Sequence, residues 1–254
     1  MYMVLLPAYN EERDIRTLLL RIRDAMLAAG LEYKIFVVND GSTDGTLEIV
    51  RSCKEELPVE ILDHGVNKGL GQAMLTGLSH VASLIDSADV LVTMDADNTH
   101  DPCLIAAMGA KIGAGAGLVI ASRYEPGGEE IGLSRARSIF SRGASCLLSL
   151  FFPVRGVKDY TCGFRAYSGE ALKDAFRAYG SRLVEERGFT CMAEILIKMR
   201  AVGVRMAEVP LVLRYDLKAG RSKMNIPRTI LRYFVLISHN LFPRPVPVKG
   251  AQIV

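Results

Sequence analysis

Continuous apolar runs alternate with amphipathic helical segments along the first half of the chain. The apolar runs lie at residues 2–6, 34–39, 59–63, 90–94 and 118–121. Between them, apolar residues recur three or four positions apart at 11–29, 46–56, 69–85 and from 101 onward, which predicts helices. Because the apolar runs do not alternate with polar residues, they predict parallel strands buried on both faces. The pattern therefore predicts an α/β, Rossmann-like fold, with a mostly parallel sheet and helices on both of its faces.

The regular alternation ends after Arg123. Helical spacing continues at about 134–151, 169–178, 190–202 and 226–242, with a strand at 205–213 and a mixed segment at 163–167. No internal repeat or low-complexity linker divides the chain. We therefore expect one domain over 1–225 that includes an amphipathic helix at about 134–151. A C-terminal amphipathic helix and tail follow over 226–254.

Charge is distributed unevenly. The 254 residues carry 31 Lys and Arg against 28 Asp and Glu, and a net charge of +3 gives no support to nucleic-acid binding. No acidic residue follows Asp216, whereas seven Lys or Arg do, and a second acid-free stretch at 134–158 contains five. Both stretches include strongly apolar segments, which favours amphipathic helices on an anionic membrane surface. The alternative is a pair of helices packed on the core with solvated Arg faces.

Several features bear on where the protein acts. The first residues, MYMVLLPAYNEE, lack the basic region of a signal peptide. The longest stretch without Asp, Glu, Lys or Arg, at 69–85, contains several polar residues and does not predict a transmembrane helix. The five cysteines have no CxxC spacing, so they predict neither a zinc cluster nor a disulfide framework and fit a reducing compartment. We expect a cytoplasmic protein.

Polar residues suited to ligand binding follow each predicted strand. In an open parallel sheet, ligands bind outside the carboxyl ends of the strands, so these residues are expected to meet at one edge. The residues that follow the strands, in chain order, are Pro7, Ala8, Tyr9, Glu11, Asp40, Lys68, Asp95, Ala96, Asp97 and Arg123.

The segment Asp95-Ala96-Asp97 is the sharpest of these features. Two carboxylates at positions i and i+2 at a strand end supply hard oxygen ligands that suit Mg²⁺ or Mn²⁺. Mg²⁺ needs only one or two carboxylates when substrate phosphates complete its shell. The alternative is a helix N-cap turn with a spare aspartate.

Two further segments suit a nucleotide. Asp40 is placed to hydrogen-bond a base or ribose, although it also belongs to an Asp-Gly turn. The segment 67–71, Asn-Lys-Gly-Leu-Gly, resembles a phosphate loop with exposed amides before a helix. The sequence contains no GxxxxGK[ST], GxGxxG or GxSxG motif, which argues against a P-loop enzyme, a dinucleotide oxidoreductase and an acyl hydrolase.

Eight segments occur in an order typical of one enzyme family. They are PAYNEE (7–12), VVNDGSTDGT (37–46), NKGLGQA (67–73), MDADNTHDP (94–102), ASRY (121–124), SRGAS (141–145), DYTCGFRAY (159–167) and VPLVLRYDLKAGRSKM (209–224). Together they resemble family 2 glycosyltransferases of the GT-A fold, and within that family the polyprenyl (dolichyl) phosphate mannose synthases.

The resemblance implies an inverting, metal-dependent transfer of a hexose from a nucleotide-sugar to a polyprenyl phosphate. The sugar and donor that it favours are mannose and GDP-mannose. It implies Mg²⁺ or Mn²⁺ at Asp95 and Asp97, and it gives Asp97, Arg123 and Arg137 catalytic roles. The residues implied for the nucleotide-sugar are Pro7, Ala8, Tyr9, Glu11, Asp40, Lys68, Asp95, Ala96 and Asp97. The residues implied for the acceptor phosphate are Arg123, Arg137, Arg214, Ser222 and Lys223, with Asp159 helping to shape that site. The resemblance also implies peripheral attachment to the cytoplasmic face of the membrane.

The sequence departs from the family pattern at two places. Thr99 stands where the family often has a glutamine that also contacts the metal, and the stretch between Arg214 and Ser222 is longer than in dolichyl phosphate mannose synthases.

Three alternatives to a polyprenyl phosphate mannose synthase remain. The donor or acceptor can differ, for example UDP-glucose, a UDP-N-acetylhexosamine or a glycan acceptor, which would need a carboxylate base such as Glu186 or Glu194. The others are a catalytically silent binding scaffold and a nucleotidyltransferase.

Overall fold

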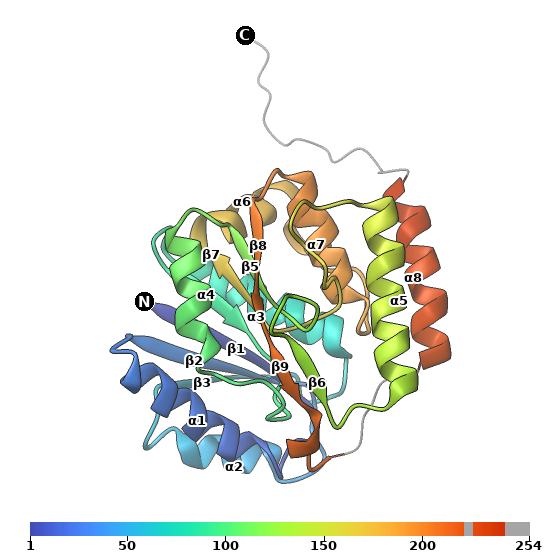
Figure 1. Cartoon of the computed structure of the whole chain (residues 1–254). Helices are drawn as coiled ribbons and strands as arrows, with labels where there is room; N and C mark the ends of the chain where they lie inside the picture. The colour runs from blue at the N-terminus through green and yellow to red at the C-terminus, as the bar shows by residue number, and fades with distance from the viewer. Residues whose placement is uncertain (221–225, 242–254) are drawn as a thin grey trace.

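The computed structural model describes residues 1–220 and 226–241, and its centre is a seven-stranded sheet (Figure 1). The strand order is β3-β2-β1-β4-β7-β5-β8. The strands are β1 (Tyr2–Ala8), β2 (Tyr33–Asn39), β3 (Val59–Asp63), β4 (Val90–Thr93), β5 (Leu118–Ser122), β7 (Arg165–Ser168) and β8 (Met206–Pro210). All neighbours are parallel except where β7 pairs antiparallel with β4 and β5. The predicted α/β fold with a mostly parallel sheet is confirmed.

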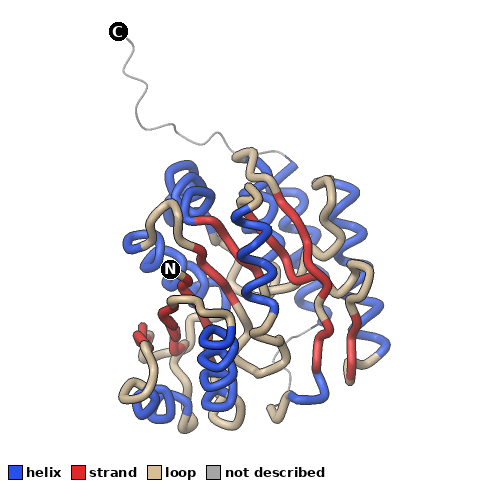
Figure 2. The backbone as a smooth tube through the Cα atoms, turned by 60° about the vertical axis from the view of Figure 1, so that its left-hand side comes forward, coloured by secondary structure: helices blue, strands red, loops and turns tan. Residues whose placement is uncertain are grey.

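Helices cover both faces of this sheet (Figures 1 and 2). On one face, α1 (Ile15–Ala28) packs against α2 (Thr46–Cys53) and α4 (Leu104–Gly113). On the other face, α3 (Leu70–Leu84) packs against α6 (Gly169–Tyr179) and the short helix η1 (Gly180–Leu183), and α6 packs against α7 (Cys191–Ala201). The inner strands β1, β2, β4 and β5 are almost fully buried, as their apolar sequences predict. The edge strands β3 and β8 are only partly buried.

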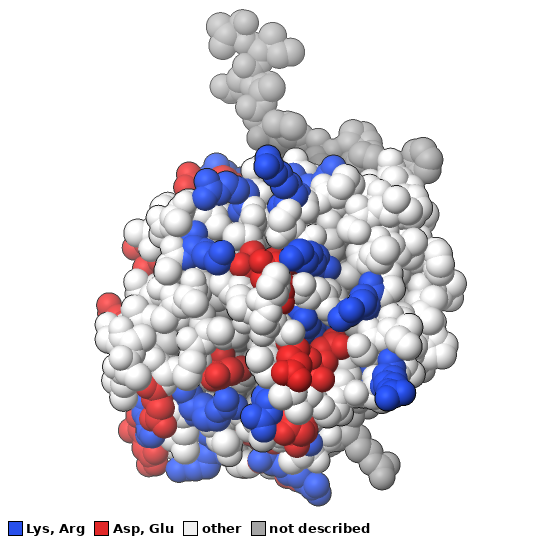
Figure 3. Space-filling model, in the orientation of Figure 1, with Lys and Arg blue, Asp and Glu red and all other residues white. Residues whose placement is uncertain are grey.

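Two long helices lie side by side at one end of the sheet. They are α5 (Arg135–Phe151) and α8 (Ile226–Leu241), which match the predicted helices at 134–151 and 226–242 (Figures 1 and 2). Tyr233, Leu236 and Ile237 bury one side of α8 in the core. In Figure 3 the right-hand side of the molecule, where Figure 1 shows these helices, is mostly free of charged residues. Within 1–220 and 226–241, no helix combines the length and apolar character needed to cross a membrane.

The single strand predicted at 205–213 is wrong, because the structure has two strands there. β8 ends at Pro210, and Leu211 then donates its amide to the Ser122 carbonyl at 2.9 Å. β9 (Val212–Arg214) leaves the large sheet and pairs with β6 (Glu129–Ile131). Proline has no amide hydrogen to donate, and it commonly marks the end of regular pairing.

Two helices begin later than their apolar spacing predicts. The helix expected from residue 11 begins at Ile15, and residues 11–14 form a turn in which the Glu11 carbonyl accepts from the Asp14 amide at 3.0 Å. The helix expected to open at Asp101 begins at Leu104. In both cases the loop after a strand extends further than predicted. These longer loops carry Glu11 and the residues after Asp97 to the sheet edge.

Candidate active site

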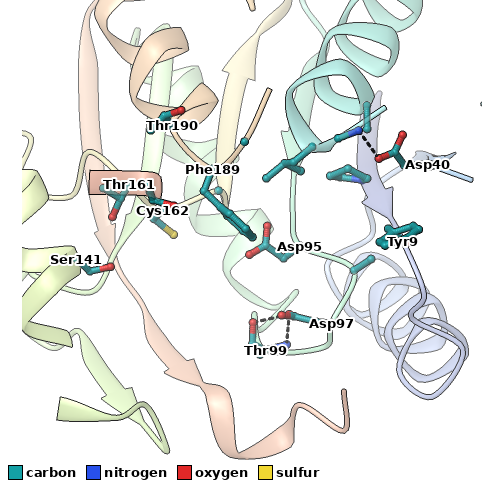
Figure 4. Close-up of a pocket in the computed structure, with 18 of the residues that line it drawn as sticks. Tyr9, Asp40, Asp95, Asp97, Thr99, Ser141, Thr161, Cys162, Phe189 and Thr190 are labelled. Atoms are coloured by element: carbon teal, nitrogen blue, oxygen red, sulfur yellow. Dashed lines mark hydrogen bonds between the residues drawn. The ribbon is translucent and has the colours of Figure 1, made fainter. Parts of the chain in front are cut away.

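A cavity of about 930 Å³ opens at the carboxyl edge of β1, β2 and β4 (Figure 4). Its lining includes eleven of the predicted site residues: Pro7, Ala8, Tyr9, Glu11, Asp40, Lys68, Asp95, Ala96, Asp97, Arg123 and Arg137. The structure therefore brings together residues from five loops and from helix α5. Arg214 does not line the cavity, because its guanidinium forms an exposed ion pair with Asp216 at 2.8 Å. Ser222 and Lys223 lie outside the described residues.

Asp95 and Asp97 follow strand β4 at the floor of this cavity. Asp97 Oδ1 accepts from the Thr99 hydroxyl at 2.7 Å, and Asp97 Oδ2 accepts from the ammonium of Lys218. Burial raises the pKa of Asp95. Burial would also raise the pKa of Asp97, but the Lys218 charge outweighs it and holds that pKa below its ordinary value. Asp97 is thus already paired with a cation, whereas the buried Asp95 carboxylate would be stabilised by binding one.

The chemistry of this pair fits a divalent metal ion. Both residues offer carboxylate oxygens, and the part of the chain that is described provides no hydrogen-bond donor to the Asp95 carboxylate. The ammonium of Lys218 already occupies a cation position at Asp97. Among the described residues no cluster of three or more His, Cys, Asp or Glu forms, so the protein offers two carboxylates. Two are sufficient for Mg²⁺ when a bound diphosphate supplies further oxygens.

Thr99 has a definite place in this arrangement. Its hydroxyl and its amide both donate to Asp97 Oδ1, at 2.7 and 3.3 Å. Thr99 therefore orients the aspartate side chain, which is visible in Figure 4. Thr99 thereby holds the Asp97 carboxylate in one orientation.

Asp40 organises the loop that follows strand β3. Its carboxylate accepts from Asn67 Nδ2 at 3.0 Å and from the amides of Lys68 and Gly69, both at 2.9 Å, and His64 Nδ1 lies 2.8 Å from it. Asp40 is 3% exposed. Asp40 therefore fixes the loop at 67–69, which lines the cavity. Its contact with a base or ribose stays a prediction.

The exposed amides expected at 67–71 are not found at residues 68, 69 and 71, whose amides have partners within the protein. The Lys68 and Gly69 amides donate to Asp40, and the Gly71 amide donates to the Arg187 carbonyl at 3.0 Å. A Cβ at residue 71 would lie 1.7 Å from the Glu186 carbonyl oxygen, so glycine is needed for the close approach of that backbone. The glycines here serve packing between two loops.

Arg123 forms the cationic wall opposite the aspartates. Its Nε and Nη2 bind Asp159 at 2.7 and 2.8 Å, and Nη2 also donates to Thr161 Oγ1 at 2.7 Å. Nη1 donates to Ser141 Oγ at 3.2 Å. Burial opposes the charge on Asp159, yet the Arg123 guanidinium holds its pKa below the ordinary value. This bidentate pair fixes the guanidinium at the cavity.

Arg137 reaches the same cavity from helix α5. Its guanidinium donates to the Tyr215 hydroxyl and lies 5.2 Å from the centre of the Tyr215 ring. Tyr215 belongs to the short helix η2 (Tyr215–Leu217), which follows β9. The two arginines therefore come from different elements and meet at one side of the cavity.

Among the lining residues that sequence reasoning missed are Lys218, Tyr215 and Phe189. Lys218 and Tyr215 lie within a segment that the motif comparison included, but their charge and ring had no assigned role. The loop 185–190 adds Phe189, which points into the cavity in Figure 4. Nothing in its sequence pattern indicates this position, because the loop is held by partners far away in sequence, Arg232 of α8 and the Gly71 amide.

The two glutamates considered as bases for a glycan acceptor have other partners. Glu186 binds Arg232 of α8 at 2.6 and 3.0 Å. Glu194 accepts from the amides of residues 185 and 186 and pairs with Lys198 at 2.7 Å. Neither lines the cavity. A polar acceptor that needs a carboxylate base finds none at these two positions.

Comparison with known proteins shows the family of this chain. The family model of glycosyl transferase family 2 matches residues 3–176. A dolichol-phosphate mannosyltransferase from Pyrococcus furiosus is 33% identical over 91% of this chain, which spans only 60% of that protein's length. An undecaprenyl-phosphate mannosyltransferase from Micrococcus luteus is 31% identical, over 88% of this chain and 87% of that protein.

The fold has a counterpart among solved structures. Glucosyl-3-phosphoglycerate synthase from Mycobacterium tuberculosis, in complex with Mn²⁺, uridine-diphosphate and glucosyl-3-phosphoglycerate, superposes with a TM-score of 0.65 at 18% identity. The match covers 93% of this chain and 79% of that one. This similarity supports the GT-A-like architecture, and the family model spans most of the chain. The chain belongs to glycosyl transferase family 2.

Proposed function

We propose that this chain transfers mannose from GDP-mannose to a polyprenyl phosphate, with inversion at the sugar carbon. The observation that carries the proposal is that one cavity is lined both by an aspartate pair and by several arginines. Asp95 and Asp97 line this cavity together with Arg123 and Arg137. We assign the aspartates to the donor and these two arginines to the acceptor phosphate. The two relatives named as polyprenyl-type phosphate mannosyltransferases support this choice of sugar and acceptor.

On the donor side, Asp95 and Asp97 would hold Mg²⁺ or Mn²⁺. The ion would supply Lewis acidity to the diphosphate as its bond to the sugar breaks. Pro7, Ala8, Tyr9 and Glu11 line the part of the cavity next to β1, where we place the nucleoside. The fold relative that binds Mn²⁺ and uridine-diphosphate lends support to a metal-assisted donor site.

On the acceptor side, the nucleophile is a phosphate oxygen. A phosphomonoester carries about −1.5 to −2 charge at neutral pH, so it attacks without a general base. Its oxygen forms a bond to the anomeric carbon while the bond from that carbon to the nucleoside diphosphate breaks, and the electron pair leaves with the diphosphate. Arg123 and Arg137 attract and orient the acceptor anion. Glu186 pairs with Arg232 and Glu194 accepts from backbone amides, so neither is needed as a base in this reaction.

A polyprenyl acceptor places the cavity near a membrane. On α5 the exposed side chains Arg135, Ile139, Arg142 and Leu150 follow helical spacing on one stripe. On α8 a similar stripe holds Leu231, Phe234 and Leu241, which are 65%, 56% and 42% exposed. Apolar and cationic side chains on one face suit an anionic membrane surface. We therefore propose peripheral attachment to the cytoplasmic face of the membrane through these two helices.

A donor panel tests the proposed function. The full chain is incubated with a short polyprenyl phosphate, Mg²⁺ or Mn²⁺, and GDP-mannose, UDP-glucose or UDP-N-acetylglucosamine, and lipid-linked sugar is measured. We expect GDP-mannose to be used best, and D97N to lose at least about a hundredfold in rate. As a matched control, D174N removes an aspartate from a surface pair with Arg177 and should retain full rate. Transfer from a UDP-sugar alone, or to free glycans alone, would contradict the proposal.

A further inference from the structure

Lys218 lies where the aspartate pair needs a cation. Its Nζ forms an ion pair with Asp97 Oδ2, and the two side chains are only 9% and 12% exposed. Thr99 already donates to the other oxygen of Asp97. A divalent ion that binds Asp97 would therefore meet the Lys218 ammonium at close range. Two cations in a poorly solvated place repel each other strongly, so they cannot share this carboxylate at low cost.

We propose that Lys218 is an internal counter-ion that a divalent metal must displace. Without metal, its ammonium neutralises Asp97. When metal binds the aspartate pair, the ammonium leaves Asp97 Oδ2. This inference rests on the proposed metal site and adds to it a residue that sets how tightly the site binds metal. Lys218 is a positioning residue in this role, since it acts through Asp97.

The place of Lys218 in the chain allows the displacement. It directly follows η2 and belongs to no helix or strand, so its side chain can move without breaking a ladder of hydrogen bonds. The backbone nearby is held, because the Ala219 amide donates to Asp14 Oδ2 at 3.2 Å.

Metal affinity tests the proposal without turnover. The full chain and K218M are titrated with Mn²⁺ alone, and free Mn²⁺ is followed by electron paramagnetic resonance. K218M keeps the apolar stem and removes the charge, and we expect it to bind Mn²⁺ about tenfold tighter or more. The matched control is K68M. Lys68 lines the same cavity but has no ion pair or hydrogen bond to Asp95 or Asp97, so a change below about twofold is expected.

D97N separates failure of this inference from failure of the proposed function. If D97N binds Mn²⁺ as well as the unaltered chain, the metal is not at this pair and the proposed function loses its metal site. If D97N loses Mn²⁺ while K218M binds no tighter than the unaltered chain, the counter-ion role of Lys218 is overturned.

Amine labelling of the unaltered chain provides a second readout that does not depend on any variant. Lysines are labelled briefly with and without saturating Mn²⁺, and labelling at each lysine is quantified by mass spectrometry. Lys218 should react slowly without metal and at least about threefold faster with it, because displacement exposes the amine. Lys158, 51% exposed in a surface pair, is the internal reference. Equal or slower labelling of Lys218 with metal would overturn the displacement.

Discussion

Asp159 determines where the Arg123 guanidinium lies. Its carboxylate is fully buried, and it accepts from Arg123 through two nitrogens and from the amides of Thr161 and Cys162. The lysine next to it in sequence, Lys158, instead points to the surface and pairs with Glu125. Adjacent residues thus form one buried and one exposed ion pair, which allows a direct comparison of their energies.

We expect D159N to lower the free energy of unfolding by about 3–5 kcal/mol, because it removes the bidentate partner of the buried Arg123 charge and leaves only Glu130, 3.4 Å from Nη1, to compensate it. E125Q breaks the exposed pair with Lys158 and should cost less than about 1 kcal/mol. Urea unfolding of the two variants measures both values. Equal losses would mean that the Arg123–Asp159 pair contributes no more than a surface pair.

The same aspartate predicts an acid-sensitive stability. The pKa of Asp159 lies below its ordinary value in the folded chain, so the unfolded chain binds this proton more readily. Its contribution is therefore fully present above the ordinary aspartate pKa of about 3.9 and declines as the pH falls. In urea titrations, the stability gap between the unaltered chain and D159N should be constant from about pH 5 to 8 and shrink below about pH 4. A gap that instead changes near pH 6–7 would point to a histidine.

At the scale of elements, the start of α3 and the loop 185–190 depend on each other. The loop is held from one side by the Glu186–Arg232 pair to α8, and from the other by the Gly71 amide. Helix α8 thereby connects, through one ion pair and one backbone contact, to the loop that Asp40 organises. The wall of the donor side thus rests on an element from the far end of the chain.

We expect G71A to destabilise the chain by at least about 1–3 kcal/mol, because the added Cβ meets the Glu186 carbonyl and backbone has to move. G143A is the matched control. Gly143 lies inside helix α5 with nothing within 4 Å of a Cβ, so alanine there should stabilise the chain by up to about 1 kcal/mol. Urea unfolding of both variants gives the comparison. Similar changes in the free energy of unfolding for G71A and G143A would show that the backbone of residues 186–187 is not in close contact with the start of α3.

The elements that sequence reasoning identified are those with local signals. Strands β1 to β5 are continuous apolar runs, and α1 and α3 have helical spacing, so their type follows from the sequence. Strand β7 was expected only as a mixed segment, since its antiparallel insertion between β4 and β5 depends on partners far away in sequence. The division of β8 from β9 follows from pairing with β6, which no local pattern indicates.

The candidate site divides in the same way. Residues directly after strands, such as Asp95 and Asp97, were predicted because the carboxyl edge of a parallel sheet gathers them. Lys218, Tyr215 and Phe189 were missed because irregular segments carry them to the cavity through tertiary packing. Position relative to a strand end can be inferred from sequence, whereas the path of a long loop cannot.

At the scale of the whole molecule, the apolar stripes of α5 and α8 predict membrane binding. We expect L231D to weaken binding to anionic vesicles by about tenfold or more, because one buried leucine contributes about 1.5–3 kcal/mol. L27D is the matched control, since Leu27 is 66% exposed on α1, much as Leu231 is 65% exposed on α8. Co-sedimentation with vesicles measures both. If L27D and L231D weaken binding equally, or neither does, the two helices are not the docking face.

The proposed transfer depends most on a metal ion held by Asp95 and Asp97 beside the donor diphosphate. A crystal of the full chain soaked with Mn²⁺ and GDP-mannose, measured at the manganese absorption edge, tests this directly. We expect one strong anomalous peak within about 2.3 Å of oxygens from both aspartates, with the diphosphate beside it. Manganese or the nucleotide-sugar bound elsewhere, with Asp97 still paired with Lys218, would contradict the proposed metal site.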